Sequence, residues 1–305
     1  MTMDFVGNEK VADFLLNKAS GGLSHAYLFV GPRGLGKRTL AELLAARVFG
    51  VEIAKLRSHP DFLVLERGVD EKTGKTNRDI KVGEMREFIE RLSLRSVTGR
   101  GVIAIVDGAE MLNDSSANSF LKTLEEPPKG TTIILISESE TDLPKTIISR
   151  AQLFRFNPVV EAKISAALVR RGVSNIKSAE VARLAHGRPG LAFDYISGKG
   201  DLVGWEDGID RLQTITGLSF AEKIKKMEDL YGDKSDPVAQ REVIRNILTA
   251  WIIAWRDALV DGKDWHGISV GELRKLIDRV RSTISDIEGN VHPRLALENL
   301  LILIP

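Results

Sequence analysis

The segment from Gly31 to Thr39 (GPRGLGKRT) constrains the fold of this 305-residue chain more than any other. It follows an apolar run, Ala26–Val30, and precedes an Ala- and Leu-rich stretch, Leu40–Val48. The segment therefore predicts a strand, a glycine-rich turn and a helix in succession. In that setting the backbone N–H groups of the turn and the helix N-terminus bind phosphate, and the lysine reaches the β- and γ-oxygens. The pattern predicts a nucleotide-phosphate site in an α/β sheet.

The residue after the lysine departs from this pattern. Mg²⁺ coordination requires Ser or Thr directly after the lysine, but Arg38 stands there and the hydroxyl follows one residue later, at Thr39. Successive helical residues differ by about 100° around the helix axis, so Thr39 does not inherit the direction of its neighbour. A cation therefore stands where the metal would be coordinated. We assign nucleotide contacts to Gly31, Gly34, Gly36, Lys37, Arg38 and Thr39.

An acidic residue at the end of a buried strand is the second part of such a site. The run VIAIV at 102–106 predicts a strand that ends at Asp107, at the edge of the sheet where ligands bind. Because Lys37 is also present, we expect the Asp107 carboxylate on the metal side of the phosphates. Without Lys37, a role as a helix or turn cap would explain Asp107 equally well. Gly108 replaces the glutamate that commonly polarises the attacking water. Glu110, the nearest carboxylate, is expected to have turned onto the next helix, so we do not assign it as the base.

Short apolar runs alternate with helical spacing over the first half of the chain, which is typical of a parallel sheet flanked by helices. Helical spacing appears at Val82–Leu94 and Asp114–Glu126, and Arg67–Arg78 is expected to be an exposed loop or hairpin. The predicted strands are Ala26–Val30, Phe62–Glu66, Gly101–Val106, Thr132–Ser137 and Gln152–Phe156.

The second half is predicted to be helical. Val160–Tyr195 indicates a small helical unit with turns at 171–172 and 187–190, and the Gly-rich segment 197–200 indicates a boundary. Beyond it, Trp205–Ile304 is predicted to be all helix, in particular Phe220–Tyr231, Val238–Leu259, Val270–Glu288 and Pro293–Leu303. The aromatic side chains of Trp251, Trp255 and Tyr231 fall on apolar helical faces, so we expect them to pack a core rather than stack on bases.

Composition excludes several classes of function. The chain has no cysteine, so disulfides, thiolate zinc sites and cysteine catalysis are excluded. Neither His186 nor His292 has a second ligand at metal-binding spacing. The formal net charge of +1 does not favour a protein that binds nucleic acid by itself, although a local basic strip stays open. No apolar run approaches the roughly 20 residues of a membrane span, and the first residues lack a signal-peptide core, so we expect no membrane and a cytoplasmic protein.

A series of short motifs runs through the first half. The most specific is Ala117–Pro128 (ANSFLKTLEEPP); the others are SHAYLF at 24–29, HPD at 59–61, Ile80 with Val82, Met85 and Arg86, LP at 143–144 and IISR at 147–150. Together they resemble the bacterial DNA polymerase III clamp-loader subunits. The length, the lack of the long C-terminal extension of the tau form, and the closing segment Asn290–Leu300 resemble the delta-prime type most.

The resemblance implies three domains: an AAA+ P-loop domain with a parallel sheet at 1–157, an all-α lid at 158–199 and an all-α collar at 200–305. Members commonly carry a four-cysteine zinc module before the HPD motif. Here Gly50–Ser58 is short and cysteine-free, so no zinc is expected.

The resemblance also implies a role for the Ser-Arg-Cys motif, present as Ser149-Arg150-Ala151. In the family this arginine projects into the ATP site of the neighbouring subunit, where an arginine finger in trans accelerates hydrolysis. The plain alternative is a surface arginine paired with a carboxylate. Ser137 is expected near the γ-phosphate, with a solvent-facing strand end as its alternative. Arg188 lies where a second sensing arginine could sit in the lid and is included among the nucleotide contacts, although a simple turn residue is the favoured interpretation.

These observations predict a delta-prime-like stator that supplies Arg150 in trans and helps load the sliding clamp on primed DNA. Its own site is expected to hold ATP or ADP weakly or as a vestige, with Mg²⁺ only if nucleotide binds. The expected partners are gamma/tau- and delta-type subunits in a pentamer, the clamp, and primer–template DNA through the complex. Two alternatives stay open: a working AAA+ ATPase that uses Lys37, Thr39 and Asp107 with Glu110 as base, and a DNA-binding protein acting alone.

Overall fold

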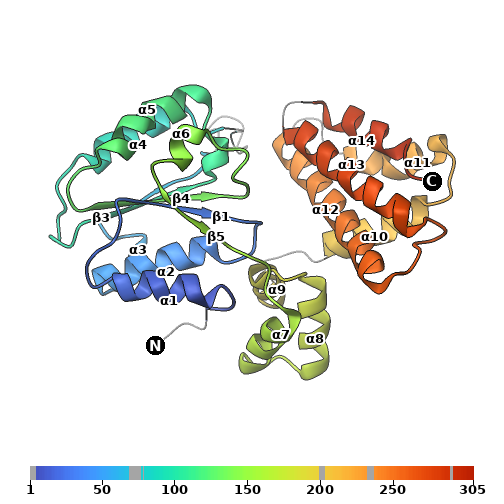
Figure 1. The fold of residues 1–305 in the computed structure, drawn as a ribbon, viewed down its shortest axis with the longest axis horizontal. Helices are drawn as coiled ribbons and strands as arrows, with labels where there is room; N and C mark the ends of the chain where they lie inside the picture. Colours follow the sequence, from blue (N-terminus) through green and yellow to red (C-terminus); the bar gives the residue numbers. More distant parts are fainter. Residues whose placement is uncertain (1–4, 69–76, 78, 199–202, 232–236, 289–290) are drawn as a thin grey trace. The chain divides into compact units, whose positions relative to one another are not determined.

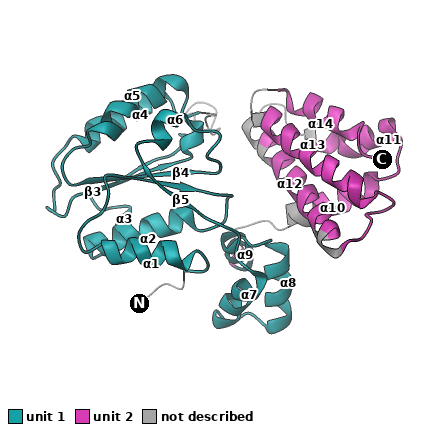
Figure 2. Cartoon of the chain, in the orientation of Figure 1, with its two compact units in different colours: residues 1–196 teal, residues 197–305 magenta. Residues whose placement is uncertain are grey.

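The computed structural model describes residues 5–68, 77, 79–198, 203–231, 237–288 and 291–305. The chain forms two compact units, residues 1–196 and 197–305 (Figures 1 and 2). The finer division at 1–157, 158–199 and 200–305 stays a prediction. The expected loop or hairpin at 67–78 falls largely outside the described residues.

A five-stranded parallel sheet organises the first unit, in the order β2-β3-β4-β1-β5. All five predicted strands are confirmed, with bounds that shift by one residue at most, and with them the α/β class. The strands are β1 (Ala26–Val30), β2 (Phe62–Leu65), β3 (Val102–Asp107), β4 (Thr131–Ser137) and β5 (Gln152–Arg155). Since the strands are parallel, their carboxyl ends meet at one edge of the sheet, where ligands bind in folds of this kind.

Helices cover both faces of this sheet (Figure 1). Along β1, Ala26 and Leu28 point into the core on one face, while Tyr27 and Phe29 point into the core on the other, as the two-residue period of a strand requires. The first core is closed by α4 (Val82–Leu92), α5 (Asp114–Glu125) and α6 (Lys145–Ile148), and the second by α1 (Glu9–Lys18), α2 (Lys37–Phe49) and α3 (Ile53–Leu56).

Three further helices complete the first unit: α7 (Glu161–Arg170), α8 (Asn175–Leu184) and α9 (Pro189–Ile196). The predicted turn at 187–190 is shorter than expected, because α9 already begins at Pro189. The start of α9 packs on the glycine-rich loop, where the N–H of Gly190 donates to the carbonyl of Gly34 at 2.8 Å. A side chain on Gly34, whose φ is +81°, would lie 3.1 Å from the Arg188 Cβ, so this close approach requires glycine.

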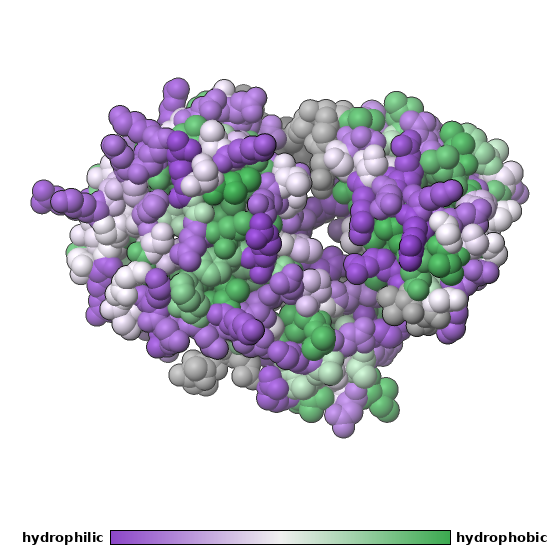
Figure 3. All heavy atoms as spheres, in the orientation of Figure 1, coloured by the Kyte–Doolittle hydropathy of each residue, from purple (hydrophilic) through white to green (hydrophobic). Residues whose placement is uncertain are grey.

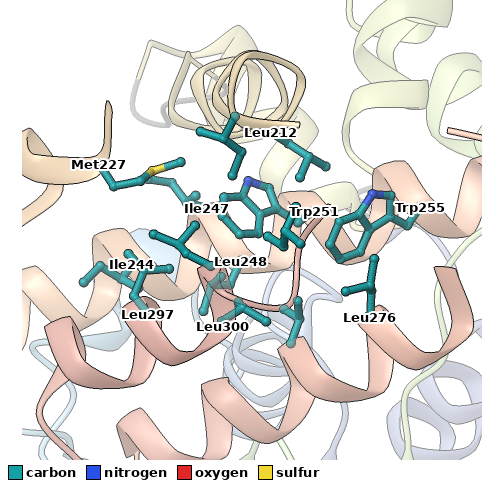
Figure 4. Close-up of a cluster of buried hydrophobic side chains, with 14 of the residues drawn as sticks. Leu212, Met227, Ile244, Ile247, Leu248, Trp251, Trp255, Leu276, Leu297 and Leu300 are labelled. Carbon is teal, nitrogen blue, oxygen red and sulfur yellow. The ribbon is translucent and has the colours of Figure 1, made fainter. Parts of the chain in front are cut away.

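The second unit is helical, as predicted. Its core contains Trp251 and Trp255, both fully buried on the helix α12, Pro237–Asp261 (Figure 4), which confirms their packing role. The Trp251 Nε1–H donates at 2.8 Å to the carbonyl of Gly208, on the helix α10, Val203–Ile215. The side chain of Tyr231 lies outside the described part of the chain. The elements are α10 (Val203–Ile215), α11 (Phe220–Met227), η2 (Glu228–Tyr231), α12 (Pro237–Asp261), α13 (Val270–Glu288) and α14 (Pro293–Leu301).

Across the described residues of both units, the helices are too short or too polar to cross a bilayer.

Asp61, from the HPD motif, fixes the loop that precedes β3. Its buried carboxylate accepts hydrogen bonds from Val97 N at 2.7 Å, Thr98 N at 2.9 Å, Thr98 Oγ1 at 2.6 Å and Ser96 Oγ at 3.0 Å. Burial acts to raise the pKa of Asp61, but the hydrogen bonds outweigh it and the pKa is lowered. The motif therefore has a structural role that its sequence does not reveal.

Replacing Asp61 with asparagine is expected to lower the free energy of unfolding by about 1–3 kcal/mol, because an amide cannot accept hydrogen bonds at both atoms. Since the pKa of folded Asp61 lies below the ordinary value of about 3.9, the contribution of the carboxylate is complete at neutral pH. That contribution is lost as the pH falls through the pKa of the folded state. Urea unfolding followed by circular dichroism at neutral and acidic pH measures both effects. Asp13→Asn, at an exposed position of α1, is the control, and equal loss in the two variants would contradict the assignment.

Candidate functional site

The glycine-rich loop joins β1 to α2 at the carboxyl edge of the sheet. Gly31, Gly34 and Gly36 all have positive φ angles, which side chains rarely adopt. At Gly31 an added Cβ would lie 2.5 Å from the carbonyl oxygen of Phe156, so the backbone path itself requires glycine. The predicted loop thus has the backbone of a phosphate site, followed by a helix that runs from Lys37 to Phe49.

Lys37 points back into its own loop. The side chain is buried, and its Nζ donates to the carbonyls of Gly31 and Pro32, the second at 2.9 Å. Burial lowers the pKa of Lys37, against the opposing effect of nearby carboxylates such as Glu138 and Glu110. An ammonium group has three donors, so one remains for a phosphate oxygen without rearrangement of the loop.

Arg38 is held in a cluster of carboxylates. Its Nη1 contacts Asp107 Oδ2 at 2.5 Å and Glu66 Oε2 at 3.3 Å, and its Nε contacts Glu42 Oε1 at 2.7 Å. Burial acts to lower the pKa of Arg38, but the hydrogen bond to Glu42 and the charge of Asp107 outweigh it, and the pKa is raised. Sequence reasoning missed Glu42 and Glu66. The spacing of Arg38 and Glu42, one helical turn, could have indicated the first of them.

The acidic residue predicted for the metal side is thus paired with an arginine. Asp107 ends β3 as expected, and Gly108 follows with φ +86°, a conformation that a glutamate rarely adopts. Glu110 lies on the short helix η1 (Ala109–Met111), as expected, but its Oε1 still accepts from Glu138 N, just beyond β4, at 3.3 Å. Its side chain therefore stays at the strand ends, where burial raises its pKa.

The remaining predicted contact residues differ in their surroundings. Ser137 ends β4 beside the loop: its carbonyl accepts from Gly31 N at 3.2 Å, and its hydroxyl donates to Ser139 O at 2.7 Å. Because Ser137 is buried, the alternative of a solvent-facing strand end is wrong. Arg188 lies beside Gly34, within reach of the loop. Thr39 is exposed, in line with the expected change of direction after Arg38.

Arg150 lies far from this loop in sequence, directly after α6 and its C-cap Ser149. Its Nε donates to Glu125 Oε1 at 2.9 Å, its Nη2 contacts the same oxygen, and its Nη1 donates to Thr146 O at 2.8 Å and to Ser149 Oγ at 3.3 Å. In the single chain Arg150 is therefore paired with the carboxylate of Glu125, as expected for a surface arginine without a role in trans.

The Arg150–Glu125 pair lies in a shallow open depression of about 480 Å³, lined by His25, Leu124, Glu125, Ser149 and Arg150. Glu125 and His25 belong to the motifs ANSFLKTLEEPP and SHAYLF, but sequence reasoning gave neither a role at this place. The depression leaves the guanidinium reachable from outside the chain, which a residue that acts on a neighbour requires.

Comparison with known proteins gives a consistent picture. A sequence model of the family described as "DNA polymerase III, delta subunit" matches residues 7–160. The DNA polymerase III subunit tau/gamma of Haemophilus influenzae is 34% identical over 168 residues, 53% of this chain and 24% of that protein. The subunit delta' of Bacillus subtilis is 34% identical over 166 residues, 50% of this chain and 48% of that protein. The chain thus spans about a quarter to a half of the length of these relatives.

Among solved structures, a mutant RuvB of Thermotoga maritima aligns with a TM-score of 0.50 and 18% identity, over 96% of this chain and 88% of that one. At this identity the likeness concerns the fold alone.

Proposed function

Because this chain belongs to the DNA polymerase III delta-subunit family of AAA+ clamp-loader proteins, we propose that it serves as a delta-prime-like stator of a clamp loader. In this proposal it joins gamma/tau- and delta-type subunits in a pentamer and helps load the sliding clamp on primer–template DNA. It supplies Arg150 to the ATP bound by a neighbour and does not turn over ATP itself.

The observation that carries this proposal is the contrast between the two arginines. Arg38 is tied to the carboxylate on which a Mg²⁺ site would depend, whereas Arg150 lies in an open depression behind a well-formed Ser149 cap. The side chain of Arg150 is 30% exposed and its pairing with Glu125 is accessible to solvent, so a stronger anion can replace Glu125 at small cost. A triphosphate is such an anion, because guanidinium groups bind phosphate in a bidentate manner.

The surface of the second unit supports a role in assembly. Large apolar side chains of its helices are exposed: Phe220 on α11, Val243 on α12 and Leu295 on α14, followed by Ile302 and Leu303. Patches of apolar side chains are visible among the hydrophilic ones on the face of both units in Figure 3. Contiguous apolar patches on a protein surface often mark sites of contact with other proteins. In the proposal, these residues contact the corresponding domains of other subunits.

Reconstitution tests the proposal. The purified chain is combined with the gamma/tau- and delta-type subunits, the sliding clamp and primed DNA from the same source. We expect a stable complex by native mass measurement, and DNA- and clamp-stimulated ATP hydrolysis that requires this chain. A chain that stays separate, or a complex that hydrolyses ATP equally well without it, would contradict the stator role.

The observation that favours the rival, a working ATPase, is Glu110, which stays at the strand ends with a raised pKa. Under our proposal the purified chain shows no multiple turnovers of ATP, because the metal position is taken by Arg38 and Gly108 supplies no base. Steady-state phosphate release measures this. Turnover that Lys37→Ala abolishes would support the rival instead.

A further inference from the structure

Mg²⁺ does not fit the residues of the nucleotide site. The ion requires a near-ideal octahedron of oxygen ligands, and in phosphate sites one or two carboxylates and a hydroxyl supply the protein's share. Here Asp107 Oδ2 lies 2.5 Å from Arg38 Nη1, and Thr39, which carries the hydroxyl, is exposed. A metal ion at Asp107 would lie against a guanidinium group that cannot lose its charge.

The phosphate half of the site does fit. The loop glycines leave the backbone open, Lys37 is buried at the start of α2, and α9 closes on the loop through Gly190 and Gly34. Arg38 adds a feature of its own: Nη2 is buried and has no hydrogen-bond partner among the described residues. A buried donor without a partner is costly, and a phosphate oxygen is a strong acceptor for it.

The charges around Arg38 fix the guanidinium in place. Asp107, Glu42 and Glu66 come from β3, α2 and the segment after β2, and they contact Nη1 and Nε only. Arg57 neutralises part of the cluster through Glu66, at 3.6 Å. The carboxylates therefore orient the arginine, and the donors of Nη2 keep no partner among the described residues.

We infer that this site has exchanged its divalent metal for Arg38, and that it binds the phosphates of a nucleoside di- or triphosphate without Mg²⁺. Lys37 and Arg38 Nη2 contact the phosphate oxygens, and Asp107 acts as the counter-ion of Arg38 instead of a metal ligand. The inference rests on the prediction that the loop is a nucleotide site, and it is independent of the proposed role of Arg150.

Binding of methylanthraniloyl-ADP and methylanthraniloyl-ATP to the purified full chain tests this, with Mg²⁺ or with EDTA at matched ionic strength. We expect the same affinity in both buffers. Arg38→Ser removes the cation and its Nη2 donor, so we expect about tenfold weaker binding in both buffers. Arg47→Ser, at an exposed position of the same helix, is the matched control and should bind as wild type does.

Arg38→Lys guards against a variant that fails to fold. It keeps the positive charge but loses the planar guanidinium that places Nη2, so we expect weaker binding that is still insensitive to Mg²⁺. Wild-type affinity that rises tenfold or more with Mg²⁺ would overturn the inference, and so would a wild-type chain that binds neither nucleotide. Both results leave the stator role untouched, because that role is measured by ATP hydrolysis at the neighbouring subunit.

Discussion

Replacing Arg150 with alanine is expected to slow ATP hydrolysis at the neighbouring site of a reconstituted clamp loader by about 10³- to 10⁵-fold. The guanidinium would meet the charge that spreads over the γ-phosphoryl oxygens in the transition state, and alanine leaves that charge without a partner. Single-turnover hydrolysis in the presence of clamp and primed DNA measures the site directly, because steady-state rates average over all ATP sites. Arg150→Lys keeps the charge without the planar fork, so we expect only partial recovery.

Two control variants distinguish a role of Arg150 as an arginine finger in trans from a simple surface ion pair between Arg150 and Glu125. Arg155→Ala removes an exposed arginine of β5 that is paired with Glu140 at 2.7 Å, and it should leave hydrolysis unchanged. Glu125→Gln breaks the same ion pair as Arg150→Ala but keeps the guanidinium. If Arg150 only held Glu125, the two variants would behave alike, each changing stability by less than about 1 kcal/mol and neither changing the rate.

The second large effect concerns the helical unit: Trp251→Ala is expected to lower its free energy of unfolding by about 3–5 kcal/mol. The indole is fully buried in the core of the second unit (Figure 4), and the substitution leaves both a cavity and an unpaired Gly208 carbonyl. Trp251→Phe fills most of the space without the N–H, so it separates the packing contribution from the hydrogen bond.

The chain provides a selective probe for this measurement. All four tryptophans, at positions 205, 251, 255 and 265, belong to the second unit, so tryptophan fluorescence during urea unfolding follows that unit alone. Val243→Ala, at an exposed position of the same helix α12, is the control, and we expect a change below about 0.5 kcal/mol. If Trp251→Ala were as mild as this control, the packing of α12 against α10 would be contradicted.

Local patterns were sufficient for most of the first unit. The strands can be recognised in the sequence as apolar runs, because both faces of a parallel sheet are buried. The loop can be recognised because its backbone requires glycine at fixed positions. The departure at Arg38 was likewise visible in the sequence, as a change of residue type at a position with a known requirement.

What the sequence could not show were partners brought together by the fold. Asp107 and Glu66 are 69 and 28 residues from Arg38, and no local spacing links them. The same holds for Asp61, whose hydrogen-bond partners lie 35 to 37 residues away, and for Glu125 beside Arg150. Glu110 is a related case: it lies on the next helix as expected, but the backbone after β3 turns through a left-handed Gly108 into a single short helical turn, which keeps the side chain at the strand ends.

We expect a descendant of this chain to be unable to regain a metal site through one mutation. A hydroxyl restored at position 38 would leave Asp107, Glu42 and Glu66 facing each other without their shared guanidinium, and carboxylates in that arrangement repel one another. A glutamate restored at position 108 would have to adopt a backbone conformation that suits glycine. Each reversal is therefore unfavourable until the other changes have been made, so selection acting one step at a time preserves the loss.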